Sequence, residues 1–270
     1  MFPYERYLRL DKFPHIWCTG CGCCIILKAM LRAIERSQIP KDNIALVSGI
    51  GCSSRTPGYV DFNTLHTTHG RAIAFATGLK LAKPKLKIIV VSGDGDATAI
   101  GGNHFIHAAR RNVDMTIIIY NNHIYGMTGG QASPTTPIGK KGSTAPYGSI
   151  EPAFDISGLG IAAGASFVAR STCYHATQLD KLIEKALLKR GFSLIEVLSP
   201  CPTYYSRPNR LGTAIEMLKW YKENSIQAET AKKMSDDERQ DKIIIGVLHD
   251  TERPEFCEEY QKLVERVQVK

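Results

Sequence analysis

Residues 87–96 have the sequence Lys-Ile-Ile-Val-Val-Ser-Gly-Asp-Gly-Asp, and residues 115–122 have the sequence Met-Thr-Ile-Ile-Ile-Tyr-Asn-Asn. Each stretch begins with a short apolar run rich in β-branched residues, which is typical of a strand buried on both faces of a parallel sheet. Residues 98–111 between them have helical spacing. Together they predict a βαβ unit whose polar residues follow the carboxyl ends of its strands, where open α/β sheets bind ligands.

The polar residues at this edge suit a magnesium ion that holds a diphosphate. Asp94 offers a carboxylate, Asn122 an amide oxygen and Ile124 a backbone carbonyl. Mg2+ takes such hard oxygen ligands and keeps part of its shell for phosphate oxygens. Gly93 and Gly95 let the backbone approach a phosphate closely, and the start of the next helix favours an anion. We therefore predict the site that holds the diphosphate of thiamine diphosphate. A Gly-Asp-Gly turn by itself is common, so the prediction rests on the combination.

The rest of the chain alternates predicted strands and helices as far as about residue 205. The strands are expected at 44–48, 166–169 and 193–198, and the helices at 70–81 and 176–189. This alternation predicts an α/β fold, a mostly parallel twisted sheet with helices on both faces.

The composition changes near the Pro/Tyr/Arg-rich segment 200–208, and we place a boundary there, with an α/β domain at 1–205 and an extension at 206–270. The extension is too short for an ordinary domain, so we expect a helical arm that packs on a partner subunit. Its predicted parts are a helix at 211–233, a charged connector at 234–241, a strand at 242–247 and a helix at 254–269.

The 270-residue chain is 43% hydrophobic and carries a formal net charge of +8. It has no apolar run of ~18 residues, so we expect no membrane span, and residues 1–6 lack the apolar core of a signal peptide. A cytoplasmic location is the resulting expectation. The positive charge suits phosphate-bearing cofactors or an acidic redox partner. Because the basic residues are scattered without a basic-aromatic motif, we do not expect nucleic acid as a partner.

Eight cysteines in such a chain indicate metal binding rather than disulfides. Cys18 and Cys21 form a C-x2-C pair beside glycine, while Cys52 and Cys201 follow predicted strands and so share the edge with Asp94. Four thiolates can hold zinc or an iron–sulfur cluster, and their spacing does not decide between these. A nearby thiamine site favours [4Fe–4S], because the carbanion left after decarboxylation is a strong reductant whose electrons need an exit.

The sequence assigns no definite role to the remaining four cysteines. Cys23 and Cys24 crowd the C-x2-C pair, and either is an alternative to Cys21 as a ligand. Cys173 and Cys257 have no partner in the sequence and are expected to be ordinary thiols.

Six short loops follow one another in this chain and jointly resemble those of a known family. They are Trp-Cys-Thr-Gly-Cys-Gly at 17–22, Gly-Ile-Gly-Cys-Ser at 49–53, Thr-Thr-His-Gly-Arg-Ala at 67–72, Gly-Asp-Gly-Asp at 93–96, Tyr-Gly-Met-Thr-Gly-Gly-Gln at 125–131 and Ser-Pro-Cys-Pro-Thr at 199–203. In this order they resemble the beta subunit of 2-oxoacid:ferredoxin oxidoreductases, most closely the 2-oxoglutarate type. The resemblance covers about residues 10–210. Thr19 and the Cys23-Cys24 pair depart from the family pattern, so redox tuning or oxygen sensitivity could differ.

The resemblance implies ligands for two metal groups and contacts for the cofactor. Cys18, Cys21, Cys52 and Cys201 would ligate one [4Fe–4S] cluster, and Asp94, Asn122 and the carbonyl of Ile124 would bind Mg2+. Thiamine diphosphate would contact Ile50, Gly51, Cys52, Ser53, His69, Gly93, Asp94, Gly95, Asp96, Asn122, Gly126 and Met127.

Two residues are expected to act directly on the substrate or the cofactor. Arg55 stands where the family has a basic residue that approaches the substrate carboxylate, which an arginine fork suits. His69 would lie beside the cofactor, where a neutral imidazole can donate to phosphate or substrate. Taken without its loop, His69 would more simply cap or pack at the start of the helix at 70–81.

The implied activity is oxidative decarboxylation of a 2-oxoacid with coenzyme A, giving acyl-CoA and CO2, with electrons leaving to ferredoxin. An alpha subunit is expected to supply the glutamate that activates the thiamine ring. Pyruvate, a branched-chain 2-oxoacid and indolepyruvate remain alternative substrates. Two alternative functions also remain: a non-redox thiamine lyase with structural zinc, and an electron-transfer or scaffold subunit without the cofactor.

Overall fold

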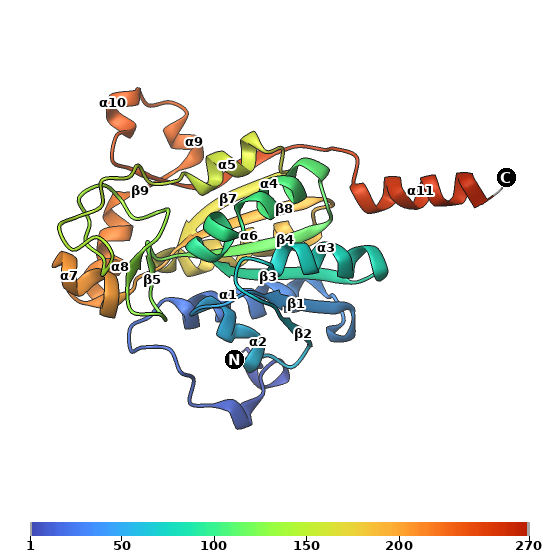
Figure 1. The fold of residues 1–270 in the computed structure, drawn as a ribbon, viewed down its shortest axis with the longest axis horizontal. Helices are drawn as coiled ribbons and strands as arrows, with labels where there is room; N and C mark the ends of the chain where they lie inside the picture. Colours follow the sequence, from blue (N-terminus) through green and yellow to red (C-terminus); the bar gives the residue numbers. More distant parts are fainter. Residues whose placement is uncertain (1, 269–270) are drawn as a thin grey trace.

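The structure, a computed structural model, describes residues 2–268 and is built around an eight-stranded sheet (Figure 1). The strands of this sheet are β1 (Ile44–Ser48), β2 (Asn63–His66), β3 (Lys87–Gly93), β4 (Met115–Asn121), β7 (Phe167–Thr172), β8 (Phe192–Leu198), β9 (Ser225–Gln227) and β10 (Ile243–Asp250). Their order in space is β2-β1-β3-β4-β8-β7-β10-β9. The strands from β2 to β7 in this order run parallel, and β10 is antiparallel to β7. The predicted mostly parallel sheet is confirmed.

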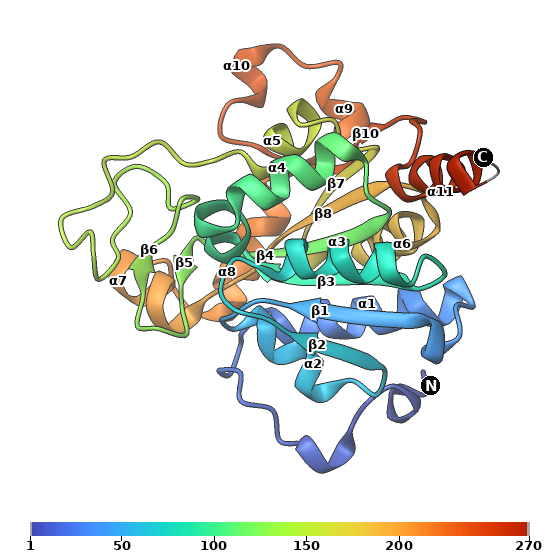
Figure 2. The same cartoon turned by 45° about the vertical axis from the view of Figure 1, so that its right-hand side comes forward.

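Helices cover both faces of the sheet (Figures 1 and 2). α1 (Cys23–Ser37) and α6 (Ala176–Leu188) pack on one face, and α3 (Ala72–Ala82), α4 (Gly102–Arg111) and α5 (Ile156–Ala162) pack on the other. Along β3, Ile89 and Val91 belong to the first core and Ile88 and Val90 to the second, because successive strand side chains point to opposite faces. Burial on both faces explains the unbroken apolar runs of the sequence.

The carboxyl ends of the parallel strands share one edge. Beyond this edge lie the hairpin of β5 (Ile124–Tyr125) with β6 (Gln131–Ala132) and the short helix α7 (Arg207–Asn209), seen at the left of Figure 1. Gly93 ends β3, and the chain turns directly into helix at Asp94, with a π-helical turn at Asp96–Ile100 before α4. The polar residues predicted at strand ends are therefore gathered at one side of the molecule.

The predicted strands at 44–48, 87–91, 115–120, 166–169 and 193–198 and the predicted helices at 70–81 and 176–189 are confirmed within a few residues. The sequence did not predict α1, the one-turn helix α2 (Thr56–Tyr59), β2 or α5. The continuous helix expected at 211–233 was wrong, because the chain there forms α8 (Ala214–Asn224), β9 and α9 (Ala228–Ala231). The interruption has a tertiary cause: residues 225–227 pair with β10, which satisfies their backbone groups in a ladder.

The expected connector at 234–241 contains one further helical turn, α10 (Asp236–Arg239), capped by Ser235. The predicted strand at 242–247 is confirmed as β10, which is longer than expected and joins the main sheet. The final helix is confirmed as α11 (Phe256–Gln268), and residue 269 of the predicted range lies outside the described residues. The division of the chain at residue 205 stays a prediction.

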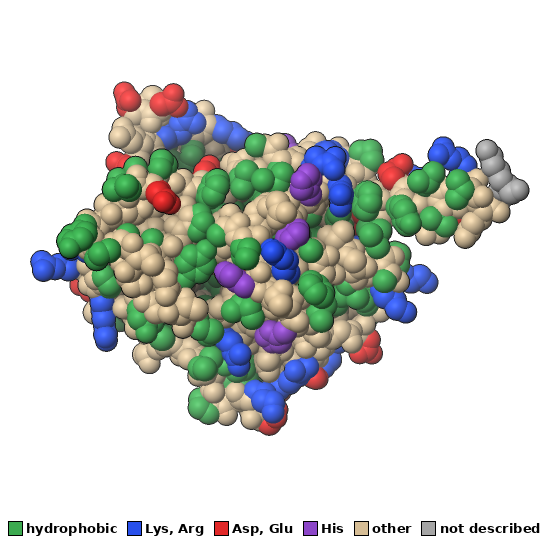
Figure 3. Space-filling model, viewed as in Figure 1, with side chains coloured by type: hydrophobic (Ala, Val, Ile, Leu, Met, Phe, Trp, Pro, Cys, Tyr) green, Lys and Arg blue, Asp and Glu red, His purple; other side chains and the backbone are tan. Residues whose placement is uncertain are grey.

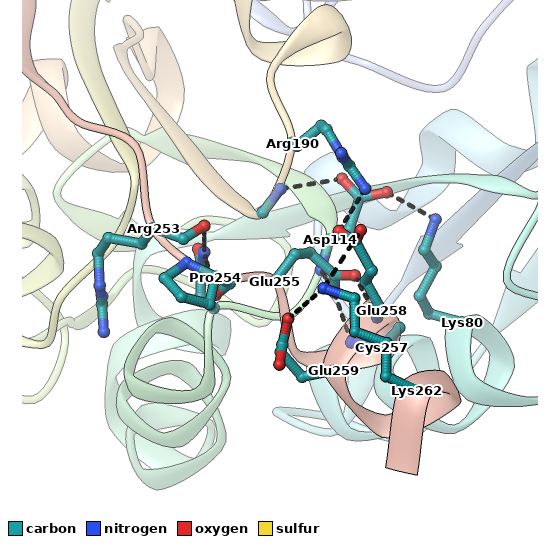
Figure 4. A network of polar contacts seen from close by, with 12 residues as sticks. Lys80, Asp114, Arg190, Arg253, Pro254, Glu255, Cys257, Glu258, Glu259 and Lys262 are labelled. Carbon is teal, nitrogen blue, oxygen red and sulfur yellow. Dashed lines mark hydrogen bonds and ion pairs between the residues drawn. The ribbon is translucent and has the colours of Figure 1, made fainter. Parts of the chain in front are cut away.

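α11 is anchored to the body through its first turn (Figure 4). The Glu255 carboxylate accepts hydrogen bonds from the backbone N–H groups of Asp114, Cys257 and Glu258 at 3.0, 2.8 and 2.9 Å. The buried Lys80 ammonium lies 2.6 Å from Asp114 at the same place. Beyond this anchor the helix extends away from the sheet (Figure 1). None of the helices in the described part of the chain is long and apolar enough to cross a bilayer.

Candidate cofactor site

A pocket of about 240 Å3 opens at the carboxyl edge, between the loops that follow β1, β2, β3 and β4. It is lined by Ile50, Gly51, Cys52, Ser53, His69, Gly93, Asp94, Gly95, Asp96, Asn122, Ile124, Gly126 and Met127, as well as Cys23, Tyr120, Tyr125 and Thr128. The structure thus brings together all the residues predicted to contact thiamine diphosphate or Mg2+. Of the last four lining residues, the sequence analysis considered Cys23 only as an alternative cluster ligand and assigned no role to the other three.

Asp94 is one of two buried carboxylates of the pocket and is 2% exposed. The hydroxyls of Ser133 and Thr135 donate to its Oδ2 at 2.5 and 2.6 Å. Burial nevertheless raises the pKa of the Asp94 carboxyl. A cation bound at Oδ1 would offset the cost of burying this charge. With the amide of Asn122 and the carbonyl of Ile124 in the same lining, the donor set fits a hard divalent cation.

Ser53 provides a further polar group in the pocket lining. Its hydroxyl is buried and has no hydrogen-bond partner within residues 2–268. Gly51, two residues earlier, has φ +118, a conformation that a side chain would strain. A buried hydroxyl without a partner costs free energy, which a phosphate oxygen accepting its proton would remove. The cavity therefore fits a diphosphate as well as its cation.

Asp96 joins three of the pocket loops. Its carboxylate accepts hydrogen bonds from the Gly70 N–H at 2.7 Å, the Ser92 hydroxyl at 2.6 Å and the Ile50 N–H at 3.3 Å. A Cβ on Gly49 would lie 2.2 Å from the same carboxylate, so the loop after β1 needs glycine there. Asp96 therefore holds the loops after β1 and β2 against the end of β3.

His69 receives its orientation from Asp96. Its Nδ1 lies 2.6 Å from Asp96 Oδ1, and because a carboxylate only accepts, the proton of the neutral ring belongs on Nδ1. Nε2 then presents a lone pair, so the neutral ring accepts a hydrogen bond there and donates from Nε2 only when protonated. This differs from the neutral donor that the sequence suggested.

The four cysteines predicted as cluster ligands come together beside this pocket. A Cβ on Gly126 would lie 3.6 Å from the sulfurs of both Cys52 and Cys201. The indole of Trp17 donates to the Cys52 carbonyl at 2.7 Å, which fixes the neighbouring Cys18 loop. Burial raises the pKa of the Cys52 thiol to about 12, with further contributions from the nearby Cys21, Cys201 and Cys18.

These sulfurs do not form a site for one ion. Among residues 2–268, no group of three or more His, Cys, Asp or Glu side chains is arranged to hold a single metal ion. The thiolates of a [4Fe–4S] cluster bind different irons and therefore stand farther apart than the ligands of one ion. The converging thiols fit such a cluster, and their role as its ligands stays a prediction.

The other cysteines surround the C-x2-C loop. Cys23 is buried at the start of α1 and lines the pocket, whereas the Cys24 sulfur lies 2.8 Å from Nε2 of His15. Cys173 packs beneath the loop, with its thiol 3.6 Å from the Gly22 carbonyl. Cys257 is buried at the base of α11.

Comparison with known proteins places the chain in a family. Residues 49–197 match the model of the C-terminal TPP-binding domain of thiamine pyrophosphate enzymes. The chain is 56% identical over 263 residues to the 2-oxoglutarate synthase subunit KorB of Methanothermobacter marburgensis, covering 97% of this chain and 92% of that protein. It is 55% identical over 267 residues to the KorB subunit of Methanocaldococcus jannaschii, covering 99% of each.

A solved structure has the same architecture over nearly the whole chain. It is the 2-oxoglutarate:ferredoxin oxidoreductase from Magnetococcus marinus with 2-oxoglutarate, coenzyme A and succinyl-CoA bound. Its TM-score is 0.89 at 34% identity, covering 99% of this chain and 91% of that chain. This chain belongs to the beta subunits of 2-oxoacid:ferredoxin oxidoreductases. It is a subunit of an oxidoreductase and carries a thiamine diphosphate-binding domain, as the six loops predicted.

Three of the four predicted cluster ligands of this oxidoreductase subunit lie outside the matched thiamine diphosphate domain, and Cys52 lies inside it. The matched range 49–197 contains His69, Asp94 and Asn122, whereas Cys18, Cys21 and Cys201 lie outside it. The segments before and after the matched domain therefore bring Cys18, Cys21 and Cys201 to Cys52 of the domain itself.

Of the two residues expected to act on the substrate or the cofactor, His69 lines the pocket and Arg55 does not. It is exposed on the turn after Cys52 and is absent from the lining. Burial and then the charge of Arg55 lower the pKa of His66, which places Arg55 near the end of β2. In this oxidoreductase subunit Arg55 therefore faces outward, and its role toward a substrate carboxylate stays a prediction.

A second layer of polar residues supports the pocket and was missed by the sequence analysis. Asn121 is not part of the pocket lining and donates to Glu196 at 2.9 Å, and Arg170 Nε lies 2.8 Å from the same carboxylate. Thr135, which holds Asp94, also lies 3.0 Å from Asn121. Two signals were available: Glu196 is a single carboxylate inside an apolar strand, and residues 133–136 are rich in hydroxyls.

Proposed function

We propose that this chain is the beta subunit of a thiamine diphosphate-dependent 2-oxoglutarate:ferredoxin oxidoreductase. The reaction is oxidative decarboxylation of 2-oxoglutarate with coenzyme A, which yields succinyl-CoA and CO2 and passes electrons through a [4Fe–4S] cluster to ferredoxin. The observation that carries the proposal is the shared edge, where the buried Asp94 and the sulfurs of Cys52 and Cys201 border one pocket region at Gly126. The names of the KorB relatives support 2-oxoglutarate as the substrate.

The residues of this chain bind and orient the cofactor. Asp94, Asn122 and the Ile124 carbonyl hold Mg2+, and the Ser53 hydroxyl donates to a diphosphate oxygen. When bound, thiamine diphosphate supplies the carbanion chemistry of decarboxylation. His69, fixed by Asp96, presents Nε2 at the pocket and can accept a proton there.

The electron exit uses the four cysteines from three loops. Cys18 and Cys21, Cys52, and Cys201 hold the [4Fe–4S] cluster, which supplies one-electron chemistry next to the cofactor. Burial in a partly apolar environment tunes the potential of such a group.

The active site is completed by an alpha subunit. That subunit supplies the glutamate that activates the thiamine ring and part of the coenzyme A site. Because Arg55 faces outward from this chain, a substrate carboxylate that meets it lies at the boundary with the partner. The assembly is expected in the cytoplasm.

The identity of the substrate is tested by activity measurements on the intact complex. Reduction of ferredoxin or viologen is measured with a panel of 2-oxoacids and coenzyme A, including pyruvate, branched-chain acids and indolepyruvate. Activity confined to 2-oxoglutarate supports the proposal. Comparable activity with another acid contradicts the assigned substrate, although the reaction class would stand.

The presence of the iron–sulfur cluster is tested by metal and sulfide analysis of the purified complex. Iron and acid-labile sulfide should copurify with the complex, and the reduced protein should show the low-temperature EPR signal of a [4Fe–4S] cluster. Zinc without sulfide would instead favour a non-redox lyase. Thiamine fluorescence of the denatured complex tests the cofactor, since its absence would leave only an electron-transfer or scaffold role.

A further inference from the structure

The C-x2-C loop reaches the surface beside the start of α8. Cys18 is exposed, whereas Cys52 is half-buried and Cys201 is buried. A Cβ on Gly20 would lie 2.5 Å from the Cβ of Ala214 and 3.6 Å from Pro202. The loop therefore packs directly on both ends of the segment 202–214. Among the four predicted cluster ligands, Cys18 is the most exposed to solvent.

The segment 202–214 carries two exposed arginines. Arg207 and Arg210 flank the helical turn α7 and are joined by a backbone hydrogen bond of 3.3 Å. In the part of the chain that the structure describes, neither guanidinium has an ion pair or side-chain hydrogen bond. Glu216, the acidic residue nearest in sequence, is engaged in the cap of α8 through the Thr213 backbone at 2.6 Å. The two positive charges are thus left for an external partner.

A neighbouring loop adds two lysines to this surface. The Asn209 side chain accepts from the Lys141 N–H at 2.7 Å and donates to its carbonyl at 3.0 Å, which fixes residues 140–141 on α7. The ammonium groups of Lys140 and Lys141 have no partner within residues 2–268. Lys and Arg side chains project at this side of the molecule, at the left of Figure 3.

Three exposed apolar side chains belong to these segments or adjoin them in the sequence. Ile16, Tyr204 and Ile215 are 63%, 41% and 67% exposed. Ile16 is two positions before Cys18, Tyr204 lies within the 202–214 segment, and Ile215 follows Ala214. A surface that combines exposed apolar side chains with unpaired charges has the usual composition of a protein docking site.

We propose that this surface, formed by Ile16, Cys18, Tyr204, Arg207, Arg210, Ile215 and the 140–141 loop, docks a small acidic one-electron carrier protein. The partner is negatively charged because four unpaired cations face it, and such charge steers encounter and fixes orientation. It receives electrons here because Cys18 is the exposed member of the cysteine group. This inference rests on the proposed function, which requires an electron acceptor outside the chain.

The test uses the assembled complex and the double variant Arg207→Glu/Arg210→Glu. Binding of an oxidised acidic ferredoxin is measured by titration calorimetry at low and high ionic strength. The variant should bind at least ~10-fold more weakly at low salt and should lose most of the salt dependence seen with the wild type. Reduction of a small viologen dye, which needs no docking surface, should keep its wild-type rate.

A charge-matched control separates docking from net charge. Lys83 and Lys85 are exposed before β3, at the opposite edge of the sheet, so Lys83→Glu/Lys85→Glu should bind the ferredoxin as the wild type does. Unchanged affinity of the Arg207→Glu/Arg210→Glu complex, or an equal loss in the control, overturns the docking surface. If the wild-type complex reduces neither viologen nor ferredoxin with any 2-oxoacid, the proposed function itself has failed.

Discussion

Asp94 and Asp96 stand two positions apart, are equally buried, and yet have different tasks. Asp96 accepts hydrogen bonds from His69, Gly70, Ser92 and Ile50, so its lone pairs are committed to protein donors. The two hydroxyls on Asp94 both reach Oδ2, and no side chain of residues 2–268 donates to Oδ1. One carboxylate therefore builds the loops, and the other meets the ligand.

The variant Asp94→Asn tests whether the Asp94 carboxylate binds Mg2+. The amide keeps the shape of the carboxylate but removes the charged ligand, so affinity for thiamine diphosphate with Mg2+ should fall by at least ~100-fold. Cofactor titration of the assembled complex, followed by fluorescence, measures the change. Ser133→Ala is the matched control, because it removes one hydrogen bond to Oδ2 and should cost ~10-fold. An unchanged, still Mg2+-dependent affinity in Asp94→Asn would rule out Asp94 as a ligand.

Strands β4, β7 and β8 support the pocket through one buried ion pair. Burial by itself would raise the pKa of the Glu196 carboxyl, but Arg170, with hydrogen bonds from Ser157 and Asn121, lowers it below its usual 4.5. A lowered pKa in the folded state means that the pair contributes stability above the unfolded pKa and loses it as pH falls through the folded value. The pair also holds Asn121, and through Thr135 it supports Asp94.

Arg170→Met should therefore destabilise the subunit by ~3–5 kcal/mol at neutral pH, because it leaves a buried carboxylate without its partner. With the arginine gone, burial dominates and the folded pKa rises, so the loss should shrink as pH drops toward and below 4.5. Urea unfolding at several pH values measures this. The double variant Arg170→Met/Glu196→Gln should recover part of the stability. A pH-independent loss would show that packing, not charge, is responsible.

At the scale of the whole molecule, α11 carries apolar side chains that the described residues 2–268 leave exposed. α11 is fixed at Glu255 and then extends beyond the sheet, with Tyr260, Leu263 and Val267 exposed (Figure 1). Their spacing of three and four residues places them on one face of the helix. As a subunit of a hetero-oligomeric oxidoreductase, the chain has a partner for which such a face is suited, and we expect the alpha subunit to cover it.

Leu263→Glu/Val267→Glu should weaken association with the alpha subunit by at least ~10-fold, because two charges would be buried in the contact. Mass photometry of the reconstituted complex measures the dissociation. Gln261→Glu/Gln268→Glu adds the same charge on another face of α11 and should assemble normally. Normal assembly of the first variant would mean that the partner does not use this stripe.

Much of the fold was predictable because its signals are local. The apolar run 44–48 coincides with β1, and the Gly-Asp-Gly turn follows β3 as expected, since strand burial and turn chemistry are written in neighbouring residues. The helix expected at 211–233 failed because residues 225–227 find backbone partners in β10, nearly twenty positions later. Local helical preference does not contain that competing contact.

The sequence by itself determined the residue types at the cofactor edge, the parallel sheet that collects them and the family to which they belong. Only the tertiary structure decided that Asp96 is committed to His69, that both hydroxyls on Asp94 reach Oδ2, that Arg55 is exposed outside the pocket lining and that Cys18 is the exposed thiol. The physical reason is distance along the chain. Hydrogen-bond partners and exposure depend on loops brought together from positions as far apart as 18 and 201, and spacing within each loop carries no information about that packing.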